Sequence, residues 1–125
     1  MKILLTGAAG FIGYHVVRKL IPQDFDIVGL DNVNNYYDPQ LKYNRLKESG
    51  IPYDAIEDNK LIKSEDADNY RFVKMDLTDK TNLMQLFETE TFDFVIHLAA
   101  QAGVRYSLTN PDAYMQANWV GFLNM

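Results

Sequence analysis

The stretch that decides the fold lies at the N-terminus and reads Ile3-Leu4-Leu5-Thr6-Gly7-Ala8-Ala9-Gly10-Phe11-Ile12-Gly13. It opens on a short apolar run, typical of a strand covered on both faces of a sheet, and runs into a glycine-rich turn. Apolar residues then recur at helical spacing, at Ile12, Val16 and Leu20. Pro22 ends this pattern, because proline terminates helices. The sequence therefore predicts a strand, a tight turn and an amphipathic helix in direct succession.

The three glycines of this turn each have a physical role. Gly7 allows a tight turn, Gly10 lets the backbone approach a pyrophosphate, and Gly13 lets the helix lie close to the strand. Free N–H groups at the start of the helix then face the anion, with the helix dipole behind them. Such a turn can serve packing alone, but its place between a strand and a helix favours phosphate binding. A Walker-type loop is excluded, because no Lys-Ser or Lys-Thr pair follows the glycines.

The alternation of strand and helix continues along the chain. Further strands are predicted at 27–30, 71–75 and 92–98, with helices over 39–48, after the Thr78-Asp79 cap, and from Asn110-Pro111 to the end. Residues 51–69 are interpreted as an irregular excursion or a short surface helix without chemistry. This order predicts an α/β fold with a doubly wound parallel sheet, a Rossmann architecture, in one domain over 1–125. A flavodoxin-like or receiver-type domain has the same alternation.

Composition excludes several classes of function. The chain has 125 residues, with 17 acidic against 12 basic residues and no cluster of basic residues, so we expect no nucleic-acid partner. The absence of cysteine excludes disulfides, Cys-ligated metals and thiol catalysis, which fits a reducing cytoplasm. No stretch approaches the length of a membrane span, so we expect no membrane association and a cytoplasmic location.

Asp31 ends the second predicted strand, 18 residues after Gly13, where a carboxylate can accept hydrogen bonds from both hydroxyls of an adenosine ribose. Between residues 31 and 41 there is no Lys or Arg to neutralise a 2′-phosphate, and the Asp31 charge would repel one. The pattern therefore favours NAD over NADP as the cofactor. The alternative is an aspartate that only starts a turn after the strand.

Further candidates follow the third and fourth strands, at the carboxyl edge where open α/β sheets bind ligands. Asp76, followed by Leu77, is placed to accept from an adenine amino group, although Asp-Leu-Thr-Asp is equally a helix cap. Ala99 and Ala100 are small enough to let backbone approach a cofactor. Just beyond them lie Gln101 and Arg105. Arg105 could bind a diphosphate or a carboxylate of the substrate, or it could be a solvated charge in a loop.

The histidines and neighbouring tyrosines receive a structural interpretation. His97 comes late in an apolar strand and is expected to be a hydrogen-bonded core residue rather than a base. His15 has no evident partner, and no group of residues has metal-ligand spacing. Tyr36 and Tyr37 could line a pocket, but packing in a turn is the favoured interpretation.

With these motifs the chain resembles the extended short-chain dehydrogenase/reductases, whose Thr-Gly-x-x-Gly-x-x-Gly turn is matched by residues 6–13. It is most similar to the nucleotide-sugar 4-epimerases acting on UDP-glucuronate, through residues 29–38 and 97–107. The resemblance implies a pyrophosphate site, an adenosine site, contacts on the nicotinamide side and a substrate contact. The residues implied for the cofactor are Gly7, Gly10, Phe11 and Ile12 at the pyrophosphate, with Gly13 completing the turn; Asp31, Asn32 and Asn35 around the adenosine ribose; Asp76 and Leu77 at the adenine; and Leu98, Ala99, Ala100 and Gln101 beside the nicotinamide-side ribose and phosphates. Asn118 resembles the asparagine that supports the active site in such enzymes, and Arg105 falls in a loop beside the substrate.

The resemblance also implies an activity and its limits. It implies an NAD-dependent parent enzyme, a homodimer, that interconverts UDP-glucuronate and UDP-galacturonate by hydride transfer at C4. The Tyr-x-x-x-Lys pair of that family is absent from these 125 residues, so we expect the first four strands of a longer enzyme and no turnover by this chain alone. A 4,6-dehydratase or decarboxylase of the same superfamily, and a non-catalytic NAD-binding module, are the alternatives. In strand order 3-2-1-4, residues 93–99 would form an exposed sheet edge that favours dimerisation or strand exchange.

Overall fold

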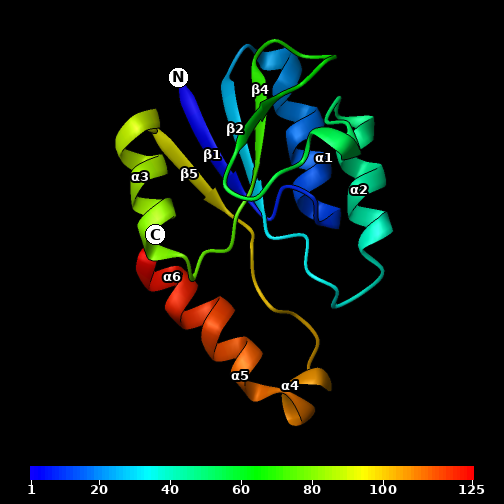
Figure 1. Cartoon of the computed structure of the whole chain (residues 1–125), viewed down its shortest axis with the longest axis vertical. Coiled ribbons are helices and arrows are strands. Elements are labelled where there is room, and N and C mark those ends of the chain that lie inside the picture. Colours follow the sequence, from blue (N-terminus) through cyan, green and yellow to red (C-terminus); the bar gives the residue numbers. More distant parts are fainter.

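A computed structural model describes residues 1–125, and its five strands form one sheet in the order β3-β4-β2-β1-β5 (Figure 1). The strands are β1 Lys2–Thr6, β2 Asp26–Asp31, β3 Leu61–Lys63, β4 Tyr70–Lys74 and β5 Phe94–His97. β1 pairs in parallel with both β2 and β5, and β2 pairs in parallel with β4. The predicted Rossmann architecture is confirmed for these four strands.

Helices cover both faces of the sheet (Figure 1). One face carries α1 Phe11–Leu20 and α2 Pro39–Glu48, and the other carries α3 Lys80–Glu90. The C-terminal helical segment extends beyond the carboxyl ends of the strands and only its last helix lies beside α3. That segment comprises α4 Tyr106–Thr109, α5 Pro111–Tyr114, a π-helical stretch Met115–Val120 and α6 Gly121–Asn124. Short 3₁₀ turns at Ile21–Gln23 and Tyr53–Ala55 complete the elements.

Two apolar cores result from the alternation of side chains along each strand. Leu5 and Ile27 belong to the core beneath α1 and α2, together with Val17 and Leu46 of those helices. Their strand neighbours point to the opposite face, where Leu4, Val28 and Val73 pack with Leu83 and Leu86 of α3. Successive residues of a strand point to opposite faces, so a short, wholly apolar strand fills both cores.

Helix starts follow the expected caps. The Asp38 carboxylate accepts from Gln40 N at 2.9 Å at the start of α2, which spans the predicted residues 39–48. The Asp79 carboxylate accepts from Asn82 N at 3.2 Å at the start of α3. Asn110 Oδ1 accepts from Ala113 N at 3.3 Å at the start of α5. Each cap satisfies an N–H that has no partner within its own helix.

Two predictions about the elements are wrong, and one is incomplete. Residues 51–69 are not wholly irregular, because they contain β3, which pairs antiparallel with β4 and makes the sheet mixed. The last helix does begin at Pro111 as predicted, but the separate short helix α4 precedes it and its middle is π-helical. The fourth predicted strand, 92–98, is shorter in the structure and runs from Phe94 to His97. A three-residue strand such as β3 has too few residues to show an alternating pattern.

β5 lies at the edge of the sheet, as the strand order predicts, and carries exposed apolar side chains. Phe94 and Val95 are 56% and 43% exposed. Natural sheets usually cover or charge such an edge, so this edge is a candidate surface for association. None of the helices has the length and apolar character needed to cross a bilayer.

At the amino end of the sheet, Glu90 joins three elements through its carboxylate. Arg71 donates to both of its oxygens, at 2.7 and 2.8 Å, and Lys2 Nζ donates to Oε2 at 2.9 Å. The hydrogen bond from Arg71 holds the pKa of Glu90 below its usual 4.5. A carboxylate with a depressed pKa stabilises the fold above its unfolded pKa, and this stabilisation is lost as pH falls through the folded pKa.

We expect Glu90→Gln to lower the free energy of unfolding by about 1–2 kcal/mol at neutral pH, because charge-assisted hydrogen bonds are lost. The difference from the wild type should shrink as pH falls below 4.5, where the wild-type carboxylate becomes protonated. Urea unfolding of both proteins at several pH values measures this difference in the free energy of unfolding. Glu88→Gln, at an exposed position of the same helix, is the control. A difference that does not depend on pH would contradict the role assigned to the charge.

Candidate cofactor site

A cavity of about 800 Å³ opens at the carboxyl ends of the parallel strands, between the turn after β1 and the segments that follow β2, β4 and β5. Thirteen of the sixteen residues that the sequence suggested line it: Gly7, Gly10, Phe11, Ile12, Gly13, Asp31, Asn32, Asp76, Leu77, Leu98, Ala99, Ala100 and Gln101. Open α/β sheets bind ligands at this edge. The cavity therefore brings together residues that four separate parts of the sequence contribute.

The glycine-rich turn is shaped by two close approaches of backbone. Gly7 has φ +73°, and a Cβ there would lie 2.9 Å from the backbone N of Ala99. A Cβ at Gly13 would lie 2.0 Å from the Gly7 carbonyl oxygen, so only glycine lets α1 start against the end of β1. At Gly10 a Cβ would be 3.1 Å from the same oxygen, which is tight but not a collision. The turn thus leaves its backbone bare on the cavity side.

The first amides of α1 are free to bind a ligand. Gly10 caps the helix without a side-chain hydrogen bond, and the first helical bond runs from Tyr14 N to Gly10 O at 3.0 Å. The N–H groups of Phe11, Ile12 and Gly13 consequently donate to no protein acceptor, and all three residues line the cavity. Three convergent N–H groups at a positive helix end fit the negative charge of a pyrophosphate.

Asp31 lies in the cavity wall, 4% exposed, with both carboxylate oxygens engaged. Its Oδ2 accepts from Ala9 N at 3.1 Å, and its Oδ1 accepts from Val33 N at 2.8 Å and from Lys42 Nζ at 2.9 Å. A carboxylate has about four acceptor sites, so one remains for a ribose hydroxyl. Asp31 therefore both fixes the glycine-rich turn and faces the cavity.

Two cations that the sequence interpretation missed also line the cavity. The window 31–41 contains no Lys or Arg, but Lys42, the next residue, pairs with Asp31, and Arg45 lies one helical turn further along α2. Arg45 donates to Ala9 O at 3.1 Å and to the Tyr37 hydroxyl at 3.0 Å. Cations therefore do lie close to Asp31, although the window 31–41 that favoured NAD contains none. Helical periodicity from the Asp38 cap would have brought residues 42 and 45 to one face.

Asp76 forms the turn expected before α3, and it also contacts the segment after β2. Its Oδ1 accepts from the amide and the hydroxyl of Thr78, at 2.9 and 2.7 Å, which is the turn-forming role. Its Oδ2 accepts from Asn32 Nδ2 at 3.0 Å, which joins the ends of β4 and β2 on the cavity wall. Burial raises the pKa of Asp76, but the hydrogen bonds from Asn32 and Thr78 outweigh it and hold this pKa below its usual value. The side chain stays charged at neutral pH.

The end of β5 is fixed by Thr6, a fully buried residue of β1. Its hydroxyl oxygen accepts from Leu98 N at 3.2 Å and Ala99 N at 3.1 Å, and lies 2.7 Å from His97 Nδ1. A hydroxyl has one proton and two lone pairs, so Thr6 donates to an unprotonated Nδ1. The predicted hydrogen bond of His97 is confirmed, but its ring is only half-buried and belongs to neither apolar core. The same contacts hold Leu98 and Ala99 against the cavity.

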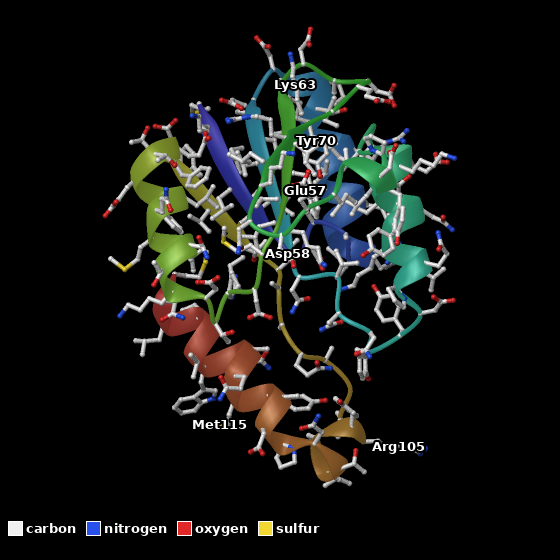
Figure 2. All side chains as sticks on the ribbon, viewed as in Figure 1. Glu57, Asp58, Lys63, Tyr70, Arg105 and Met115 are labelled. Carbon is white, nitrogen blue, oxygen red and sulfur yellow. The ribbon has the colours of Figure 1, made fainter.

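Three suggested residues lie outside the cavity lining: Asn35, Asn118 and Arg105. Asn118 donates to Gln101 O at 3.1 Å and accepts from Gln101 N at 2.7 Å, so it positions a lining residue. Arg105 is exposed, and its side chain points away from the molecule beside α4 (Figure 2). Tyr36 and Tyr37 both line the cavity, so the less favoured of the two sequence interpretations is correct.

We expect Gly13→Ala to destabilise the fold by more than about 2 kcal/mol, because the methyl group collides with the rigid Gly7 carbonyl. Gly10→Ala, where the contact is 3.1 Å and φ is −71°, should cost clearly less. Chemical denaturation of the two variants measures the difference. Equal stability of the two variants would show that α1 is not held against β1 as described.

Burial lowers the pKa of His97, and the Thr6 hydroxyl also favours the neutral ring. We expect an NMR titration to place this pKa below 6.5, so stability falls as pH drops below that value. Thr6→Val should raise the pKa of His97, because it removes the donor to Nδ1. Thr89→Val, at an exposed site, is the control. An unchanged His97 titration in Thr6→Val would contradict this hydrogen bond.

Comparison with known proteins identifies relatives along nearly the whole chain. The UDP-glucuronate 4-epimerase of Thermodesulfobacterium geofontis is 43% identical over 122 residues, which is 98% of this chain and 33% of that protein. UDP-glucuronate 4-epimerase 1 of Arabidopsis thaliana is 42% identical over 125 residues, 100% of this chain and 25% of that protein. The chain thus spans a quarter to a third of the length of these relatives.

A solved structure agrees in fold. The UDP-glucuronic acid 4-epimerase from Bacillus cereus, in complex with UDP-glucuronic acid and NAD, matches with a TM-score of 0.77 at 28% identity, over 99% of this chain and 34% of that one. A family model described as GDP-mannose 4,6 dehydratase matches residues 4–125. The resemblance to nucleotide-sugar epimerases is confirmed, and the chain belongs to the GDP-mannose 4,6 dehydratase family.

Proposed function

We propose that this chain binds NAD and serves as the cofactor-binding part of a nucleotide-sugar 4-epimerase that interconverts UDP-glucuronate and UDP-galacturonate. The observation that carries the proposal is the cavity itself, where three N–H groups without protein acceptors and the Asp31 carboxylate lie on neighbouring elements. The two features match the two ends of an adenosine diphosphate, an anionic pyrophosphate and a ribose with two hydroxyls. The relatives named as UDP-glucuronate 4-epimerases support the choice of sugar.

The residues of the chain would then have separate tasks. The amides of Phe11, Ile12 and Gly13 hold the pyrophosphate, and bare Gly10 lets it approach. The free acceptor site of Asp31 takes a ribose hydroxyl. Bound NAD supplies reversible acceptance of a hydride, which is the chemistry that epimerisation at C4 requires.

Other parts of the cavity would orient the two ends of the cofactor. Asp76 and Leu77 lie on the side expected for the adenine, and Asn32, which donates to Asp76, lies on the side expected for the ribose. Leu98 and Ala99, fixed by Thr6, and Ala100 and Gln101 line the side expected for the nicotinamide ribose. Small side chains there let the cofactor lie against backbone. Asn118 acts through Gln101 as a positioning residue, and we keep Asn35 and Arg105 as proposed contacts to cofactor and substrate.

We further propose a homodimer and a cytoplasmic location. The homodimer is proposed from the resemblance to nucleotide-sugar epimerases. For these 125 residues taken alone, the exposed edge strand β5, with Phe94 and Val95, also favours self-association. The absence of cysteine fits a reducing compartment. Sedimentation that shows a monomer at every concentration would contradict the dimer.

Binding of NAD is tested by isothermal titration calorimetry of the 125-residue chain. We expect wild type to bind NAD, and Gly10→Ala to bind it at least tenfold more weakly, because the methyl group enters the space of the pyrophosphate. Glu88→Ala, at an exposed position of α3 outside the cavity lining, is the control. Wild type that binds no NAD, or Gly10→Ala that binds it unchanged, would contradict the proposed site.

The sugar chemistry is tested on a full-length protein that contains these 125 residues and is as long as the relatives named above. Incubation with UDP-glucuronate and NAD should produce UDP-galacturonate without loss of carbon dioxide. A 4,6-dehydratase is the second candidate, because the matching family model is named for that reaction. Release of carbon dioxide would assign a decarboxylase, and a 4-keto-6-deoxy sugar formed from a nucleotide hexose would assign a dehydratase.

A further inference from the structure

Lys42 and Arg45 line the same cavity as Asp31, and the proposed function assigns a role to neither. Lys42 is 7% exposed, and its Nζ lies 2.9 Å from Asp31 Oδ1. Arg45, three residues further on α2, lines the same cavity. A buried lysine needs a partner for its charge, and the Asp31 carboxylate provides it.

These cations keep donors that the protein does not use. Lys42 has three N–H donors, and one points to Asp31. Arg45 uses only Nη1, toward Ala9 O and the Tyr37 hydroxyl, and leaves Nη2 and Nε without protein acceptors. Guanidinium and ammonium donors side by side on one helix are suited to a phosphate dianion.

Both cations are also held by an aromatic ring that does not depend on Asp31. Lys42 Nζ lies 5.6 Å from the centroid of the Tyr37 ring, and the Arg45 guanidinium lies 5.9 Å from the same centroid. Cation–π attraction acts at these distances. Removal of the Asp31 carboxylate would therefore leave two positive groups near their present places, rather than release them into solvent.

The charged residues around the cavity show that Asp31 neutralises a neighbouring cation. Its charged lining consists of Asp31, Asp76, Lys42 and Arg45. Asp76 is engaged with Asn32 and Thr78, whereas Asp31 directly neutralises Lys42. One negative charge thus offsets the cation nearest to the ribose position and adds its own repulsion toward a phosphate there.

We propose that Lys42 and Arg45 form a latent site for the 2′-phosphate of NADP, and that Asp31 masks it. Selection of NAD then rests on the Asp31–Lys42 pair, not on a lack of cations near the ribose. The proposal rests on the proposed function, since it assumes that the adenosine ribose lies at Asp31. It adds that loss of a single charge reverses the cofactor preference.

The test is calorimetric titration of NAD and NADP into the 125-residue chain and its variants. Wild type should bind NAD at least tenfold more tightly than NADP. Asp31→Ser should bind NADP more tightly than NAD, because both cations then face the 2′-phosphate. Asp31→Ser/Lys42→Met should lose at least tenfold of that NADP affinity. Asp31→Ser/Lys47→Met, which removes an exposed lysine of the same helix and has the same net charge, should keep it.

Two further variants keep the test decisive where serine at position 31 prevents folding, as judged by circular dichroism. Asp31→Asn retains an acceptor for Ala9 N or Val33 N and should show the same reversal. Lys42→Met alone should widen the preference for NAD at least threefold, because Asp31 then repels the 2′-phosphate without a neighbouring cation.

The outcomes separate this proposal from the proposed function. Wild type that binds neither nucleotide contradicts both. Wild type that binds NAD, with position-31 variants that still prefer NAD, overturns the latent site alone. So does NADP affinity that is equal in Asp31→Ser and Asp31→Ser/Lys42→Met.

Discussion

The close approach of α1 to the end of β1 is the constraint on which the rest of the site depends. The space for a Cβ at Gly13 is already taken by the Gly7 carbonyl oxygen, 2.0 Å away. This contact brings the helix start to the sheet edge, where the amides of Phe11, Ile12 and Gly13 face the cavity without acceptors. An acidic chain with a net charge of −5 can therefore offer a local positive potential, because backbone supplies it.

Side chains hold this arrangement from two directions. Asp31 accepts from the amides of Ala9 and Val33, so the carboxylate that faces the ribose position also ties the glycine-rich turn to β2. Thr6 accepts from the amides after β5 and so fixes the opposite wall. Hydrogen-bonded buried polar groups help to specify one geometry, and every buried side-chain polar atom in residues 1–125 has at least one hydrogen-bond partner. Binding residues here are thus structural residues as well.

Much of this could be predicted from the sequence, because its signals are local. The glycine spacing predicts the turn, Asp38-Pro39 predicts the start of α2, and thirteen of the suggested residues do line one cavity. What could not be predicted depends on contacts between distant segments. β3 forms only because β4 offers it an edge, and Lys42 belongs to the site only because α2 lies over Asp31. Whether these residues bind NAD stays a proposal.

The most direct measurement is a ¹⁵N NMR titration of the chain with NAD, which reports each amide separately. The account predicts that the largest downfield proton shifts occur at Phe11, Ile12 and Gly13, because an N–H that gains a phosphate acceptor is deshielded. Shifts confined to other residues, with these three amides unchanged at saturating NAD, would contradict a pyrophosphate at the start of α1.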